Sequence, residues 1–130
     1  MVLAYRLAEQ KKLNLNERYV IKSAEEMGRL IESIELSTVA SKQSCDEMKR
    51  IMRAQKSGDL KIPHYLTVPV AHKTGETGTV TNDVGMIYAR SGTIILSFYN
   101  MNLSGPRAET EDAMGRVARL IVEYFDGKPL

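Results

Sequence analysis

The sequence has no Trp and a single Cys, Cys45, among its 130 residues. One Cys excludes a disulfide within the chain, and we expect Cys45 to be a buried thiol because it falls on the apolar face of a predicted helix. No apolar run approaches the ~18 residues that a membrane-spanning helix requires. The net charge is only +2, with basic and acidic residues interspersed. Neither a membrane nor a nucleic acid is therefore expected as a partner.

The remaining composition is that of an ordinary soluble domain, with 43% apolar and 26% charged residues. A chain of this length fits one domain, which we place over residues 1–130. The first eight residues do not form a signal peptide, because Arg6 and Glu9 interrupt the apolar segment and charge follows it rather than precedes it. As written, the chain is expected to stay in the cytoplasm.

Periodicity and capping signals predict four helices. The first covers residues 2–12, and residues 13–22 alternate as an extended arm or a short strand. Ser23 and Glu26 form a capping box at the start of a second helix, whose predicted face contains Met27, Leu30, Ile31 and Ile34. Ser44 and Glu47 have the same spacing and predict a third helix to about Gln55. A final helix is predicted from about Glu109 to Phe125, with Met114, Val117, Ala118, Ile121 and Phe125 on its face.

Three strands are predicted between the third and fourth helices. They cover residues 68–73, 83–90 and 93–101, and Ser91-Gly92 forms a hairpin turn between the last two. Helices, then an antiparallel meander, then one helix that packs back on it give an α+β fold with a three-stranded antiparallel sheet.

One motif lies at the end of the first predicted strand. It reads Val70-Ala-His-Lys-Thr-Gly75 and is followed by Asn82-Asp-Val-Gly85. A Lys-Thr-Gly on a strand is the third motif of the serine β-lactamases and penicillin-binding proteins. With the Lys61-Ile-Pro63 loop and the terminal helix, residues 23–127 resemble the C-terminal half of the class A serine β-lactamases. Residues 2–18 resemble the helix that follows the nucleophile in that family.

The sequence departs from this family at the residues that carry its covalent chemistry. It contains no Ser-x-x-Lys and no Ser-Asp-Asn, and it passes from about Arg18 to Ala24 where the family has most of its helical subdomain. The chain therefore resembles a truncated β-lactamase-like domain. The resemblance implies that Lys73 and Thr74 bind a substrate carboxylate, that Gly75 lets the ligand approach the strand, and that the Glu76 N–H takes the place of one oxyanion-hole donor.

Without an activated Ser, water is the expected nucleophile, and it needs a base or a metal. His64 and His72 are the candidate groups, since imidazole is the commonest metal ligand. The first hypothesis is a small hydrolase in which zinc or manganese, bound by His64 and His72 and assisted by Lys73, activates water on an ester or phosphoester. The alternative is a non-catalytic fragment or carboxylate-binding module that uses Lys73 and Thr74. True serine β-lactamase activity is the third and least favoured reading.

A homodimer is also expected. The strand predicted over residues 93–101 is internal in the resembled family, whereas here it becomes an apolar edge. Such an edge favours pairing with a second copy, and a two-fold pair doubles each His and supplies more metal ligands. Residues 18–22 are an alternative cover for this edge. The expected substrate is a small molecule.

Overall fold

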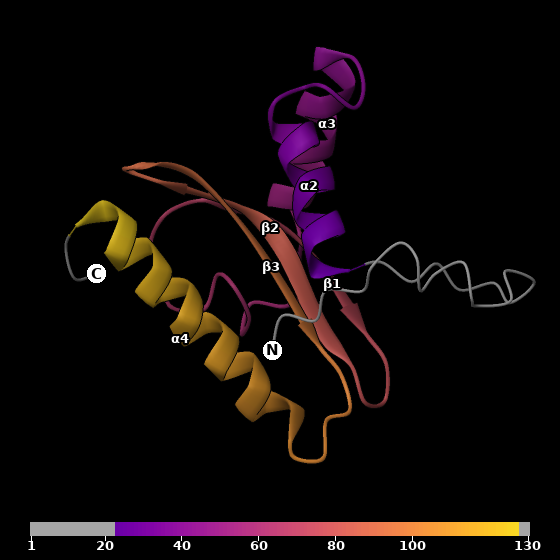
Figure 1. The fold of residues 1–130 in the computed structure, drawn as a ribbon, viewed down its shortest axis with the longest axis vertical. Helices are drawn as coiled ribbons and strands as arrows, with labels where there is room; N and C mark the ends of the chain where they lie inside the picture. The colour runs from indigo at the N-terminus through magenta and orange to yellow at the C-terminus, as the bar shows by residue number, and fades with distance from the viewer. Residues whose placement is uncertain (1–22, 128–130) are drawn as a thin grey trace, which may run out of the picture.

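The computed structural model describes residues 23–127. Its elements are, in chain order, α2 (Ala24–Glu35), α3 (Lys42–Arg53), β1 (Val70–Glu76), β2 (Thr81–Ala89), β3 (Gly92–Asn100) and α4 (Arg107–Asp126). The three strands form one antiparallel sheet in the order β1-β2-β3. The α2–α3 pair and α4 lie on opposite sides of this sheet (Figure 1). The predicted α+β class is confirmed, while the predicted helix 2–12 and arm 13–22 lie outside the described residues.

Helix α2 begins where the capping box predicts. Glu26 N–H donates to Ser23 Oγ at 3.0 Å, and Ser23 N–H donates to Glu26 Oε2 at 2.9 Å. These bonds satisfy backbone donors that have no partner in the first turn. Ile31 and Ile34 are buried as predicted, but Leu30 is 41% exposed. The apolar face of α2 is therefore narrower than its pattern suggests.

Helix α3 corrects the second capping prediction. It begins at Lys42, with Ser41 as the N-cap, and the Ser44 N–H donates to Ser41 Oγ at 3.1 Å. Ser44 thus lies inside the first turn. Glu47 bonds Arg50 rather than the helix start. Cys45 is fully buried, as predicted.

The strands are displaced from their predicted limits. β1 was predicted to end at Lys73, but pairing continues through Thr74↔Asp83 and Gly75↔Asn82 to Glu76↔Thr81. A tight turn makes this extension possible, because Thr77 N–H donates to Val80 O at 3.1 Å and closes the hairpin. The Lys-Thr-Gly motif therefore lies within a paired strand.

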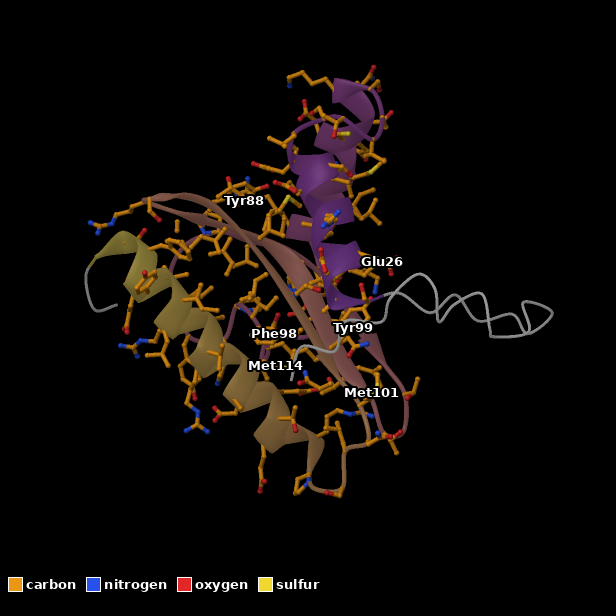
Figure 2. All side chains as sticks on the ribbon, in the orientation of Figure 1. Glu26, Tyr88, Phe98, Tyr99, Met101 and Met114 are labelled. Carbon is orange, nitrogen blue, oxygen red and sulfur yellow. The ribbon has the colours of Figure 1, made fainter. Side chains whose placement is uncertain are left out.

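Two apolar clusters hold the helices on the sheet. Because strand side chains alternate between faces, Met86 belongs to the cluster under α2 and α3, and its neighbour Ile87 to the cluster under α4. Phe98 and Met114 lie between the sheet and α4 (Figure 2). Each face of the central strand is thus covered, which fixes the register of β2.

Helix α4 contacts the sheet through part of its predicted face, because Met114 and Ala118 are buried as predicted. Met114, Ala118 and Val122 are buried at four-residue spacing, whereas Val117 and Phe125 are exposed. Gly115 allows α4 to approach the loop before β1, since an added Cβ would lie 2.9 Å from Lys61 O and 3.0 Å from His64 Cβ. In the part of the chain described here, none of the helices has the length and apolar character needed to cross a bilayer.

Candidate functional site

The site predicted from the Lys-Thr-Gly motif lies along the outer edge of β1. Tyr88 N–H donates to Pro69 O at 3.0 Å, which fixes the phase of the β1–β2 ladder. Hydrogen-bonded and non-hydrogen-bonded residue pairs alternate along an antiparallel ladder. Counted from the hydrogen-bonded Pro69–Tyr88 pair, His72, Thr74 and Glu76 fall in non-hydrogen-bonded pairs. The backbone N–H and C=O groups of these three residues therefore point away from β2. Over residues 23–127, no further strand pairs with this edge. It therefore offers backbone donors to a ligand.

The Lys73 ammonium lies on this edge. Lys73 is exposed, and its Nζ donates to the carbonyl of Thr74, one of the groups that points outward. Gly75 is also exposed, and no atom of residues 23–127 lies within 4 Å of the position that a Cβ would take. A cation, an outward N–H at Glu76 and a backbone with which no other strand of residues 23–127 pairs are thus adjacent on one strand edge.

The Thr74 hydroxyl is held from the loop after α3. Gln55 Nε2 donates to Thr74 Oγ1 at 3.1 Å and to Ser57 Oγ at 2.7 Å. A hydroxyl has one donor and two acceptor sites, so accepting from Gln55 leaves the Thr74 hydroxyl with a proton to donate. Ser57 Oγ, 3.5 Å from Thr74 Oγ1, is one acceptor within reach. Sequence reasoning missed Gln55, because a residue at a helix end carries no signal for a contact with a strand 19 residues later.

His72 is part of a buried pair. Its Nδ1 lies 2.9 Å from Asp83 Oδ1 and 3.0 Å from Asp83 Oδ2, and both residues are buried. The second oxygen also accepts from the Ile62 N–H at 3.2 Å. Asp83 thus ties β1, β2 and the Lys61–Pro63 loop together, and one nitrogen of His72 is already used.

His64 lies in a different environment. It is exposed, and its ring contacts the Tyr65 ring with centroids 4.3 Å apart. Tyr65 in turn donates to Asp112 on α4, and this bond raises the pKa of Tyr65 and lowers that of Asp112. Among residues 23–127, no three His, Cys, Asp or Glu side chains are grouped so as to hold a metal ion. A metal shared by His64 and His72 stays a prediction that needs further ligands.

Glu76 is bound by two cations. Its Oε1 accepts from Lys61 Nζ at 2.5 Å, and its Oε2 lies 3.2 Å from Arg107 Nη1. These contacts, that of Lys61 first, lower the pKa of Glu76. The sequence indicates Lys61 only as part of the Lys61–Pro63 loop and gives no sign of Arg107, because no motif marks either residue as a partner of Glu76.

Comparison with known proteins decides the family. Residues 1–125 match the family model described as "Beta-lactamase enzyme family". The chain belongs to this family. No curated protein matches it. Among solved structures, this β-lactamase-family chain is similar to the TLA-1 extended-spectrum β-lactamase, with a TM-score of 0.78 and 22% identity over 91% of this chain and 47% of that one.

Two further structures show the same fold. A β-lactamase from Chitinophaga pinensis has a TM-score of 0.77 and 24% identity, covering 89% of this chain and 47% of that one. The L158E mutant of PBP-A, solved as an acyl-enzyme complex with penicillin G, has a TM-score of 0.69 and 24% identity, covering 82% and 40%. The β-lactamase-family chain thus spans less than half the length of each of these structures.

Proposed function

We propose that this chain binds the carboxylate of a small acyl compound of the β-lactam type along the outer edge of β1, as part of a β-lactamase-like hydrolase. One observation carries this proposal. The Lys73 ammonium donates a hydrogen bond to the Thr74 carbonyl, which points away from β2, and the exposed Gly75 lies next to it. Lys73 and the Thr74 hydroxyl hold the carboxylate. The outward Glu76 N–H donates to an acyl oxygen, as a backbone donor does in an oxyanion hole.

Substitution of Lys73 tests this proposal. We expect Lys73→Met to weaken binding of benzylpenicillin by about tenfold or more, because a charge-assisted hydrogen bond is lost. Binding is measured by ligand-observed NMR titration. The methyl ester of benzylpenicillin, which has no carboxylate, should bind weakly to both proteins. Lys42→Met is the matched control, since Lys42 is exposed and its ion pair within residues 23–127 is with Asp46 on its own helix. Equal binding by the Lys73→Met and unsubstituted chains would reject the site.

Covalent chemistry gives a second prediction. Benzylpenicillin should leave the mass of the 130-residue chain unchanged, because no Ser stands three residues before a Lys. Intact-protein mass spectrometry after prolonged incubation measures this. A stoichiometric adduct on any Ser would show that the chain carries an activated nucleophile of another kind.

Metal-assisted hydrolysis by a homodimer is the separate third prediction. In that hypothesis, a metal bound by His64 and His72 needs further ligands, either from residues outside 23–127 or from a second copy of the chain. If the second copy supplies them, hydrolysis depends on the dimer. Light scattering should then give twice the 14.6 kDa of one chain. Chelation should abolish ester or phosphoester hydrolysis, and zinc or manganese should restore it. Hydrolysis that persists in His64→Ala, in His72→Ala and under a strong chelator would reject the metal.

A further inference from the structure

β3 is an edge strand, and alternate residues along it direct their backbone groups away from the sheet. Over residues 23–127, β3 pairs with β2 and with no strand on its other side. The Pro69–Tyr88 bond shows that the even-numbered residues of β2 bond β1, which leaves the odd-numbered residues of β2 to bond β3. These lie opposite the even-numbered residues of β3. The N–H and C=O groups that point outward therefore belong to Thr93, Ile95, Ser97 and Tyr99.

β3 lacks the features that commonly keep an edge strand from pairing. Lys, Pro and bulges serve that purpose in natural sheets. The strand reads Gly-Thr-Ile-Ile-Leu-Ser-Phe-Tyr-Asn, with no charge and no Pro, and its register with β2 runs from Asn100 to Gly92 without a bulge. Like charges directly opposite each other destabilise a pair of strands. A strand without charge can therefore pair with a copy of itself without repulsion.

An apolar groove between β3 and α4 continues this edge. Its lining includes Phe98, Met114 and Val117, and Glu109 is the one charged residue of the described part of the chain that lines it. Phe98 and Met114 are buried (Figure 2), whereas Val117 is 41% exposed. Gly115 packs on the loop before β1, and a helix turns ~100° per residue. Val117 therefore points to the opposite side of α4, toward the edge of β3.

We propose that this edge pairs with β3 of a second copy, antiparallel to it and related by a two-fold axis at Leu96. Leu96 is the midpoint of β3, so both strands pair over their whole length in this register. Outward groups then meet outward groups. Thr93 forms a hydrogen-bonded pair with the partner's Tyr99, and Ile95 forms one with the partner's Ser97. The contact is isologous, because each strand uses the same residues as its copy.

The same register brings apolar side chains together on the α4 side of the sheet. Ile94, Leu96 and Phe98 lie on that side, where they belong to the apolar cluster under α4. Leu96 lies opposite the partner's Leu96, and Phe98 lies opposite the partner's Ile94. Apolar cross-strand neighbours of this kind stabilise a sheet. Each copy thus places its Ile94 beside Phe98 at the groove of the other.

This interface goes beyond the carboxylate site proposed on β1, because β1 and β3 are opposite edges of the sheet. In the joined sheet, the two β1 strands lie at the outer ends. The interface also gives the homodimer of the metal hypothesis a defined surface, but the pairing of β3 itself involves no metal. A strong chelator should therefore leave the dimer intact, which separates failure of the metal hypothesis from failure of this one.

Disulfide cross-linking tests the register in a chain that carries Cys45→Ala, which removes the single Cys. Leu96→Cys should then cross-link two copies under mild oxidation, because the Cα atoms of a non-hydrogen-bonded antiparallel pair lie ~4.5 Å apart. Ile94→Cys is the matched control, since it lies on the same face and is also half-buried. Its two copies are offset by four residues, or ~13 Å, which is too far for a disulfide. Equal cross-linking of the two variants on a non-reducing gel, or none in either, would overturn the proposed register.

Sedimentation velocity over a range of concentrations tests the same interface without a Cys substitution. The unsubstituted chain should be a dimer at micromolar concentration, and Val117→Lys should weaken the dimer about tenfold, because it places a charge at an apolar groove. Ile51→Lys is the matched control and should dimerise like the unsubstituted chain, since Ile51 is 57% exposed on α3, on the other side of the sheet. A monomer at every concentration, or equal dimerisation by the two Lys variants, would reject this interface. Slow amide exchange at Ile95 and Ser97 in such a monomer would instead assign the cover of this edge to residues 18–22.

Discussion

We expect Asp83→Ala to lower the free energy of unfolding by about 3 kcal/mol, because it removes the shared partner of two buried groups. His72 Nδ1 lies within 3.0 Å of both Asp83 oxygens, and Ile62 N–H donates to one of them at 3.2 Å. Asp83 itself has 0% exposure. Neither water nor another side chain can replace it without opening the interface between β2 and the loop before β1.

Denaturant unfolding followed by circular dichroism measures this loss, which should also lower the Tm by on the order of 10 °C. Asp59→Ala is the matched control. Asp59 is an exposed acid on the loop before Lys61, so its removal should change stability by no more than about 0.5 kcal/mol. Equal stability of the two variants would mean that the His72–Asp83 pair contributes nothing to the fold.

Local signals predicted the parts of the fold that depend on neighbours in sequence. The capping box of Ser23 and Glu26 needs only three residues of separation, and its two bonds form as expected. The same spacing at Ser44 and Glu47 failed because Ser41, three residues earlier, caps the helix instead. A spacing rule cannot choose between overlapping candidates, since the choice depends on which turn packs Cys45 against the sheet.

The sequence indicates residues of the candidate site only where a motif contains them. Lys73, Thr74 and Gly75 were identified by their sequence and lie together on the edge strand β1, whose outer side pairs with no other strand of the described residues. Gln55, Lys61 and Arg107 reach that strand from elements far along the chain. Their contacts follow from how the loop after α3 and the start of α4 pack on the sheet, and no local pattern encodes that packing.

The positions of His64 and His72 in the fold also could not be predicted from local sequence. Their count and type suggested a common metal site, but one ring is buried beside Asp83 and the other is exposed beside Tyr65. Side chains eight positions apart need not converge when a strand and a loop separate them, because a strand extends ~3.3 Å per residue. Residue type alone therefore indicated the candidate ligands without indicating their separation.

By contrast, the structure explains why the Asn82-Asp-Val-Gly85 segment ends in Gly. Gly85 lies opposite His72 in the β1–β2 register. A Cβ added at Gly85 would lie 2.5 Å from Ala71 O, 2.8 Å from His72 Cβ and 3.0 Å from His72 Cα. None of these atoms is the end of a flexible side chain. The absence of a side chain at Gly85 is what allows the buried imidazole to lie against β2 and reach Asp83.

We therefore expect Gly85→Ala to cost about 3 kcal/mol of stability, because β1 must move away from β2 to admit the methyl group. Gly75→Ala is the matched control on the adjacent strand, since no atom of the described residues lies within 4 Å of its added Cβ. Ala is preferred to Gly in a strand by ~0.5–1 kcal/mol. Gly75→Ala should therefore leave the free energy of unfolding unchanged or raise it slightly, whereas Gly85→Ala lowers it. Denaturant unfolding of both variants distinguishes them. A Gly85→Ala chain as stable as the Gly75→Ala chain would show that β1 can separate from β2 at little cost, and that the His72–Asp83 contact does not hold the Lys73 strand in place.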